Sequence, residues 1–265
     1  MPSSSLLASR TVVVSGVGAG LGHRVAAAVV RDGGNAVLGA RTEANLARTA
    51  AEIDPEGART AYRATDITDE QQCRALAALA RERFGGIDAV VHVAAWDSYF
   101  GGVEDADFAT WQQVIDVNLL GTLRMTRACL PALRERRGGS VVFIGTQSAI
   151  ASPSQVRQAA YAASKGALTS AMYSLAHELG PDHIRVNTVL PGWMWGPPVE
   201  AYVRFTADAE GVPEEEVRGR LAARMALPEL ATDGDVADAV VFLASDRARA
   251  ITGQSLLVNA GELMR

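Results

Sequence analysis

The feature that most constrains the fold is a regular alternation of short β-branched runs with longer segments of helical periodicity. The run TVVVS at 11–15 predicts a strand buried on both faces, because it shows no alternation of apolar and polar residues. Between Leu21 and Val29 apolar residues then recur at helical spacing and predict one apolar helix face. A strand followed by such a helix is the first half of a βαβ unit.

The alternation continues to the end of the chain and predicts a sheet with helices on both faces. Further helices are expected at 42–53, 69–84, 107–136, about 154–179 and 233–244. The expected strands cover residues 11–15, 35–40, 59–64, 88–93, 140–145, 184–190 and 255–259. We therefore expect an α/β fold with a doubly wound, seven-stranded parallel sheet of the Rossmann-like kind.

One long stretch interrupts the alternation. Residues 191–232 follow the sixth expected strand and are too long for a routine connection, and such segments inside compact domains are usually functional lids. No Pro/Ser-rich linker or charge block divides the chain, so one domain is expected over 1–265. The sequence predicts a single domain with a lid-like insertion over a site.

Charge and cysteine content exclude several classes of protein. A net charge of -5 and a pI near 5.5 argue against a nucleic-acid partner. Cys73 and Cys129 form no C-x-x-C pair, and the four histidines lack metal-ligand spacing, so we expect no metal site and a reducing compartment. The N-terminus lacks a signal-peptide pattern and no window approaches about 18 apolar residues, so a soluble cytoplasmic protein without membrane contact is expected.

The first chemical motif is the glycine-rich stretch SGVGAGLG, Ser15 to Gly22, between the first strand and the first helix. Glycines there let the backbone approach a pyrophosphate, and the helix N-terminus offers oriented N–H groups and a positive dipole end. The alternative is a tight turn that uses glycine only for backbone freedom. The position in the first strand–helix turn favours dinucleotide binding.

The spacing of these glycines, G-x-x-x-G-x-G, resembles the short-chain dehydrogenase/reductase family. Four further features match that family: Tyr161 and Lys165 in Y-x-x-x-K, Ser148 thirteen residues before the tyrosine, Asn118 in VNLLGT, and the ending ITGQSLLVNAG at 251–261. Singly, the serine could belong to a turn, the asparagine to a helix surface and the tyrosine to a packed core. Their joint occurrence over almost the whole chain favours the family interpretation.

The resemblance implies a role for each of these four side chains. Tyr161 would be the general acid/base, and Lys165 one helical turn away would lower its pKa, because a nearby ammonium favours the phenolate. Lys165 would also hold the nicotinamide ribose. Ser148 would hydrogen-bond the substrate oxygen, and Asn118 would order a water that relays protons to the lysine.

Cofactor choice depends on the end of the second strand. Ala40 stands where an NAD-selective acid would lie, and Arg41 follows, which favours NADP(H). NAD(H) is the alternative, with Arg41 stacked on adenine, because Ala19 replaces a second basic residue. Asp66 would lie beside the adenine ring or cap a helix. Including Tyr161 and Lys165, the resemblance places cofactor contacts at Ser15, Gly16, Gly20, Leu21, Gly22, Arg41, Asp66, Ile67, Ala94, Pro191 and Gly192.

Three departures from the family pattern affect the cofactor contacts. HVAA at 92–95 replaces N-N-A-G, Gly196 replaces a threonine that often contacts the nicotinamide carboxamide, and Ser15 replaces threonine conservatively. His92 is expected to be a structural residue at the end of a strand rather than a second acid/base. The proton-transfer residues are unaffected.

Aromatic residues gather in the segments after the fourth and sixth strands, at the strand ends where α/β sheets bind ligands. Trp96, Trp193, Trp195 and Tyr202 are the expected substrate-pocket residues, unless these rings only pack against one another. No cluster of basic residues there would recruit a carboxylate or phosphate, although Arg204 could. A pocket of this kind predicts a bulky apolar or aromatic ketone or alcohol.

The sequence thus predicts an NAD(P)-dependent oxidoreductase that interconverts a secondary alcohol and a ketone. A 3-oxoacyl thioester reductase is one alternative and should show a basic surface for the acyl carrier. A non-catalytic dinucleotide-binding regulator is another, although it would not need all four residues of the catalytic set. By the resemblance we also expect a homotetramer or dimer that buries the outer faces of the helices at 107–136 and 154–179.

Overall fold

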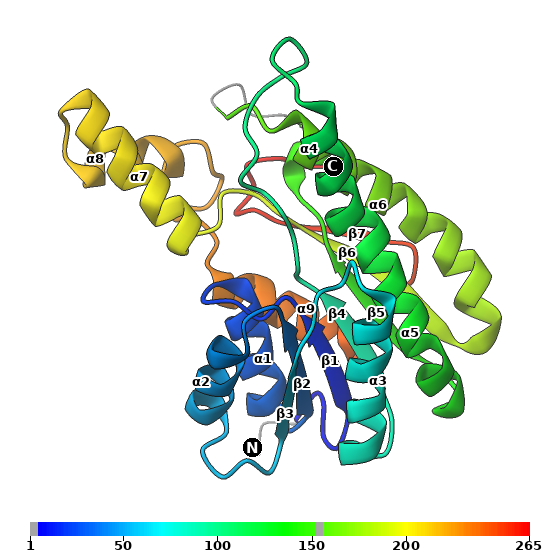
Figure 1. The fold of residues 1–265 in the computed structure, drawn as a ribbon. Coiled ribbons are helices and arrows are strands. Elements are labelled where there is room, and N and C mark those ends of the chain that lie inside the picture. The colour runs from blue at the N-terminus through cyan, green and yellow to red at the C-terminus, as the bar shows by residue number, and fades with distance from the viewer. Residues whose placement is uncertain (1–4, 152–155) are drawn as a thin grey trace.

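The computed structural model describes residues 5–151 and 156–265 and contains a seven-stranded sheet in which all neighbouring strands are parallel (Figure 1). The strands are β1 (Thr11–Ser15), β2 (Asn35–Ala40), β3 (Thr60–Ala64), β4 (Ala89–His92), β5 (Gly139–Ile144), β6 (Ile184–Pro191) and β7 (Ser255–Val258). Their order in the sheet is β3-β2-β1-β4-β5-β6-β7. Successive strands are added on one side of β1 up to β3 and on its other side from β4 onward. This change of side confirms the doubly wound architecture.

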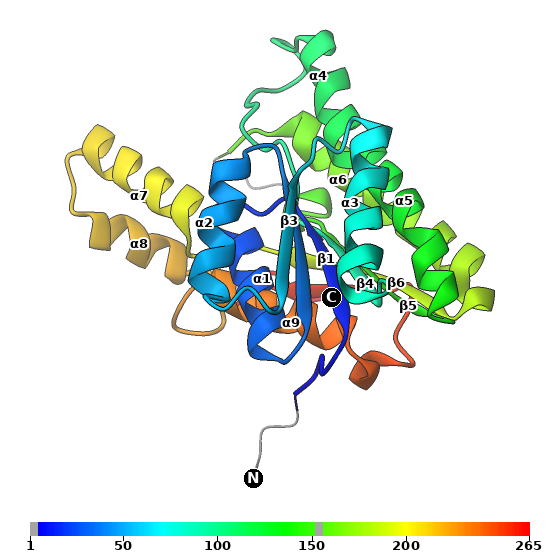
Figure 2. The same ribbon diagram turned by 60° about the horizontal axis from the view of Figure 1, so that its bottom comes forward.

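Helices cover both faces of this sheet (Figure 2). The helices are α1 (Leu21–Arg31), α2 (Glu43–Ile53), α3 (Glu70–Phe84), α4 (Phe108–Ile115), α5 (Thr122–Glu135), α6 (Ala159–Leu179), α7 (Pro197–Glu210), α8 (Glu214–Ala222) and α9 (Asp233–Ala244). Residues of α1, α2 and α9 share one apolar cluster with the sheet, and residues of α3, α5 and α6 share the other.

Strand β1 shows why its sequence lacks alternation. All five of its residues are buried. Val12 and Val14 belong to the cluster with α1 and α9, whereas Val13 belongs to the cluster with α3, α5 and α6. Because successive side chains point to opposite faces and both faces are covered, the middle of the strand is apolar on both sides.

Two of the expected helices differ from the structure. The helix expected at 107–136 is interrupted by a π-helical turn, η1 (Asp116–Gly121), between α4 and α5. The predicted start near Ser154 lies outside the described residues, and α6 begins at Ala159, after Gln158 at its N-cap. Such π turns occur frequently at functional sites, and this one carries Asn118.

The segment after β6 forms a helical hairpin rather than an irregular loop. Helices α7 and α8 project from the body of the molecule (Figures 1 and 2). Pro197 begins α7, and Gly211 ends it in the left-handed conformation with φ 68°. Val203, Val217 and Leu221 form a small cluster of their own between the two helices. The function of this hairpin as a lid stays a prediction.

In the described ranges, no helix combines the length and apolarity needed to cross a membrane. Within the same residues no three His, Cys, Asp or Glu side chains gather as a metal site would require. Cys73 and Cys129 are free, buried thiols, and burial raises the pKa of both.

Candidate active site

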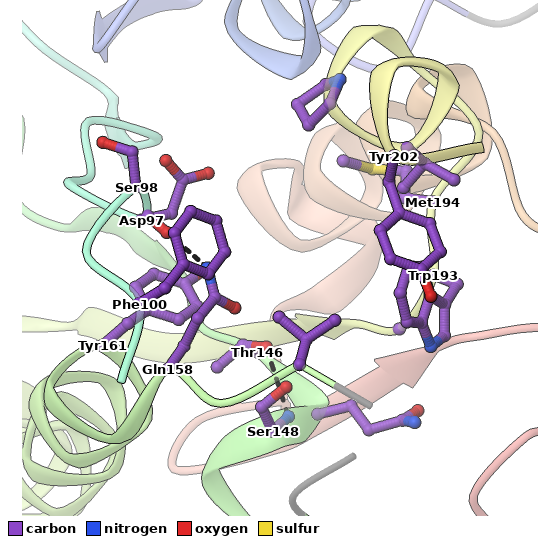
Figure 3. Close-up of a pocket in the computed structure, with 15 residues that line it drawn as sticks. Asp97, Ser98, Phe100, Thr146, Ser148, Gln158, Tyr161, Trp193, Met194 and Tyr202 are labelled. Atoms are coloured by element: carbon purple, nitrogen blue, oxygen red, sulfur yellow. Dashed lines mark hydrogen bonds between the residues drawn. The ribbon is translucent and has the colours of Figure 1, made fainter. Parts of the chain in front are cut away.

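Two adjoining hollows lie at the carboxyl ends of the strands, where open α/β sheets bind their ligands. A groove of about 710 Å³ is lined by the glycine turn after β1, by Ala40 and Arg41, and by the loop after β4. A pocket of about 400 Å³ is lined by the turn after β5, by Tyr161 and by the segment that follows β6 (Figure 3). Asp97 and Ser98 line both, so the two hollows are contiguous.

The glycine turn forms a backbone cradle that side chains would fill. Gly16 has φ 96°, and a Cβ there would lie 2.1 Å from the backbone nitrogen of Ala94. A Cβ on Gly22 would lie 2.2 Å from the carbonyl oxygen of Gly16. Gly20 is the N-cap of α1, whose first N–H groups lack intrahelical acceptors. These residues fit the pyrophosphate of a dinucleotide at a helix N-terminus.

The other expected cofactor residues lie around this cradle. Ile67 and Ala94 line the groove. Ser15 is buried, and its hydroxyl has no hydrogen-bond partner among the described residues. Leu21 is the first residue of α1 and packs into the core, so its side chain supports the turn rather than the groove. Pro191 ends β6, and Gly192 faces the smaller pocket.

Arg41 is the one basic side chain that lines the groove in the described part of the chain. It is exposed and forms no ion pair with another described residue, and its neighbour Ala40 offers no carboxylate. Asp66 also lines the groove and accepts hydrogen bonds from the backbone N–H and hydroxyl of Thr68 at 2.9 and 2.7 Å. The helix-capping alternative for Asp66 is wrong, because Asp69 caps α3.

Tyr161 projects from the first turn of α6 into the smaller pocket (Figure 3). Burial raises the pKa of its phenol and nearby Asp97 raises it further, while a hydrogen bond with the Thr146 side chain lowers it. The net direction is upward. At neutral pH the phenol is therefore protonated and can act as a proton donor.

Lys165 lies one turn further along α6 and is 1% exposed. Its Nζ donates a hydrogen bond to the carbonyl oxygen of Ile144 at 2.8 Å and lies 5.9 Å from the Tyr161 ring centroid. Burial lowers the pKa of Lys165 to about 8. Desolvation of the phenol raises the Tyr161 pKa in the structure, so the lowering of that pKa by the Lys165 ammonium stays a prediction.

Ser148 and Thr146 both line the pocket, on the short 3-10 turn that follows β5. The Thr146 hydroxyl accepts a hydrogen bond from the Ser148 backbone N–H at 3.2 Å (Figure 3). The same side chain lowers the pKa of the Tyr161 phenol. Thr146 is not among the residues predicted from the sequence. Its position at the carboxyl end of a predicted strand, two residues before Ser148, was the signal that could have identified it.

Gln147, between these two hydroxyls, joins the turn to distant parts of the chain. Its side-chain amide donates to Glu262 Oε2 at 2.7 Å, and its Oε1 accepts from Asn259 at 2.6 Å. Glu262 also pairs with Arg224, whose guanidinium lies 5.9 Å from the Trp193 ring centroid. The turn after β5, the C-terminal segment and the segment after β6 are thus connected by one network of contacts.

Asn118 is fully buried, and its side chain is occupied by protein partners. Its Oδ1 accepts from the Trp96 backbone N–H at 2.7 Å, and its Nδ2 donates to the Trp96 carbonyl and the Ser164 hydroxyl, both at 3.0 Å. This amide therefore ties the loop after β4 to α6. The water relay remains a prediction.

The structure gives physical reasons for two of the departures from the family pattern, at His92 and at Gly196. His92 is buried, contacts Thr126 at 2.9 Å and lies 5.4 Å from the Phe143 ring, and burial lowers its pKa to about 3. It is neutral and structural, as expected. At position 196 a side chain has no room, because a Cβ would lie 2.5 Å from the carboxylate of Asp233.

The aromatic residues divide between the two hollows. Trp193 and Tyr202 line the smaller pocket with their rings 4.9 Å apart. Trp96, also predicted for the substrate pocket, lines the cofactor groove instead. The prediction for Trp195 is not supported. Trp195 lies on a separate hollow beside α1 and α9, with the Arg218 guanidinium 4.5 Å from its ring centroid.

A dinucleotide cradle that opens into a pocket lined by a half-buried tyrosine, with a buried lysine one turn away, is typical of an enzyme of hydride transfer. Known proteins agree with this class. A family model described as Enoyl-(Acyl carrier protein) reductase matches residues 16–262. The chain is 31% identical to Dehydrogenase/reductase SDR family member 4 of Homo sapiens, over 96% of this chain and 88% of that protein.

Two further comparisons extend over nearly the whole chain. L-fucose dehydrogenase of Bos taurus is 31% identical, over 98% of this chain and 92% of that protein. The structure of an actinorhodin polyketide ketoreductase with NADPH is similar with a TM-score of 0.85 and 29% identity, covering 94% of this chain and 95% of that one. The chain belongs to the short-chain dehydrogenase/reductase family and is an NAD(P)-dependent oxidoreductase of alcohol and ketone groups.

Proposed function

We propose that the protein interconverts a bulky apolar or aromatic ketone and its secondary alcohol, with NADP(H) as the preferred cofactor. The observation that carries the proposal is that Tyr161, Thr146 and Ser148 line the same pocket as the rings of Trp193 and Tyr202, which lie across the cavity from Tyr161 (Figure 3). Its volume of about 400 Å³ suits a substrate of small-molecule size.

When bound, the nicotinamide would supply or accept a hydride at the carbonyl carbon. In reduction, Tyr161 would donate its phenolic proton to the carbonyl oxygen, as its raised pKa allows. Ser148 would hydrogen-bond that oxygen, and Thr146 would orient the phenol through the bond it already makes. Lys165 would place positive charge beneath the tyrosine, and Asn118 would hold the loop that closes the site.

The two hydroxyls should respond differently to substitution. Ser148→Ala is expected to lower kcat/KM for ketone reduction by about 10²-fold, as for the loss of a donor to a developing oxyanion. Thr146→Val removes the bond that lowers the Tyr161 pKa, so that pKa rises and the pH–rate profile of alcohol oxidation moves to higher pH. Steady-state kinetics across pH measure both. Full activity of Ser148→Ala would exclude it as the oxygen anchor.

Arg41 should discriminate between the two cofactors. Arg41→Ala is expected to weaken NADP(H) binding by about tenfold or more, because a charge-assisted bond to the ribose phosphate is lost, and to change NAD(H) binding little. Nicotinamide fluorescence titrations measure both dissociation constants. Arg48→Ala, which removes an exposed arginine of α2 outside the groove, is the matched control. Equal weakening of both cofactors by Arg41→Ala would contradict the assignment.

The charges of residues 191–232 argue against the alternative of a 3-oxoacyl thioester reductase that binds an acyl carrier. A carrier is acidic at its attachment site and needs a basic docking surface. Residues 191–232 contain four arginines against seven acidic residues. The regulator alternative has no use for a tyrosine that lines an open pocket with a buried lysine one helical turn away. Assembly as a homotetramer or dimer stays a prediction.

A screen of ketones and alcohols with both cofactors, followed at the absorbance band of the reduced nicotinamide, tests the proposal. We expect aryl and bulky alkyl ketones to be reduced with NADPH. Absence of turnover over all carbonyl classes, with normal cofactor binding, would favour the regulator alternative.

A further inference from the structure

Asp97 occupies the junction of the cofactor groove and the substrate pocket. Its backbone is held on both sides. Trp96, the residue before it, bonds Asn118 through both its N–H and its carbonyl, at 2.7 and 3.0 Å. The carbonyl of Asp97 itself accepts a hydrogen bond from the Gln158 side chain at the start of α6. The structure therefore places this residue beside the reacting groups through defined contacts.

The carboxylate of Asp97 is not neutralised. It is exposed to the hollow and makes no ion pair or hydrogen bond with another described residue. No arginine or lysine lines the pocket in the described part of the chain. The negative charge of Asp97 raises the pKa of both Tyr161 and Lys165, so its field extends to the proton-transfer pair.

The remainder of the pocket complements this charge with aromatic rings. Phe100 lies on the same loop as Asp97, and Trp193 and Tyr202 lie across the cavity (Figure 3). Aromatic faces attract cations, and an uncompensated carboxylate adds a direct Coulombic attraction. The same carboxylate repels substrates that carry a carboxylate or phosphate.

We propose that the natural substrate carries a protonated amino group near its reacting carbon, and that Asp97 recognises this group. The substrate class is thus an aryl or alkyl amino ketone, or the corresponding amino alcohol. This inference rests on the proposed function. The carbonyl carbon accepts a hydride from the reduced nicotinamide and the oxygen accepts a proton from Tyr161, whereas the ammonium group is unchanged.

The test compares three ketones that differ in one substituent. These are β-dimethylaminopropiophenone, which is cationic at neutral pH, its carbon isostere isopentyl phenyl ketone, and the anion β-benzoylpropionate. We expect kcat/KM for the cation to exceed that for the isostere by about tenfold, which is the factor that a Coulombic attraction of about 1.4 kcal/mol gives. The anion should be reduced more slowly than the isostere.

Asp97→Asn should reduce the ratio of cation to isostere to within about twofold, because the amide keeps the shape of the side chain without its charge. Glu104→Gln is the matched control. Glu104 is exposed on the same loop and does not line the pocket, so the preference should persist in that variant. Calorimetric binding of phenethylamine to wild type and Asp97→Asn provides a readout independent of turnover.

Two results would overturn the inference. One is a wild type that reduces isopentyl phenyl ketone as well as the cation. The other is an equal effect of Asp97→Asn on all three ketones together with a displaced pH–rate profile, which would mean that Asp97 acts on Tyr161 rather than on the substrate. Turnover of the isostere establishes ketone reduction by itself, so failure of the amine preference is distinguishable from failure of the proposed function.

Discussion

Replacement of Tyr161 by phenylalanine is expected to lower kcat by about 10³-fold, within the range that positioned general acids contribute. The substitution removes only the hydroxyl. The ring keeps its place on α6, and the pocket keeps its lining. Cofactor affinity should change little, because Tyr161 lines the substrate pocket and not the groove. Single-turnover kinetics and nicotinamide fluorescence measure the two quantities separately.

The same change at Tyr173 provides the control. Tyr173 lies on the same helix, is exposed and is remote from the pocket, so Tyr173→Phe should retain wild-type turnover. Turnover by Tyr161→Phe at the wild-type rate would contradict the proton-transfer mechanism. Loss of activity in both variants would instead indicate damage to α6.

The sheet could be predicted from the sequence because each buried strand is recognisable from its own short run of residues. A strand covered on both faces favours consecutive apolar residues, and β1 and β4 show this in the runs 12–14 and 89–91. The strand–helix alternation then restricts the topology, since parallel neighbours need a crossover between them. Helix α9 was predicted with its observed bounds, and Thr232 closes a capping box at its start.

Helices α7 and α8 were not predicted, although the sequence contains local features of helix ends. Two prolines at the start of α7 and a glycine at its end mark a helix, and three glutamates begin α8. The prediction for residues 191–232 rested only on the length of the segment. The π turn at Asn118 is different, because it depends on how the side chain bonds Trp96 and Ser164 across the fold.

The chemistry of the site divides in the same way. Motif spacing identified Tyr161, Lys165 and Ser148, since these residues lie near one another in the chain. The raised pKa of the phenol was not predictable, because it depends on burial by segments far apart in sequence. Glu262 reaches Gln147 across 115 residues, and no local pattern reports such a contact.

Gly16→Ala should have a large effect on stability and therefore tests the cofactor cradle independently of activity. We expect the free energy of unfolding to fall by about 3 kcal/mol or more. An alanine at φ 96° adopts a disfavoured backbone conformation. Its Cβ would also lie 2.1 Å from the backbone nitrogen of Ala94. Neither backbone segment can move away without breaking the hydrogen bonds that join Ser15 to the loop after β4. Urea denaturation of the purified proteins measures the change.

Gly18→Ala separates close approach from a general sensitivity of this turn. Among residues 5–151 and 156–265, none other than the chain neighbours has a heavy atom within 4 Å of a Cβ on Gly18, and its φ is not positive. The free energy of unfolding should therefore stay within about 0.5 kcal/mol of wild type. Equal losses in the two variants would mean that the whole turn tolerates no side chain. A loss confined to Gly16→Ala would show that this glycine is required because the end of β1 contacts the loop after β4 there. Both segments line the groove, and the same loop carries Asp97.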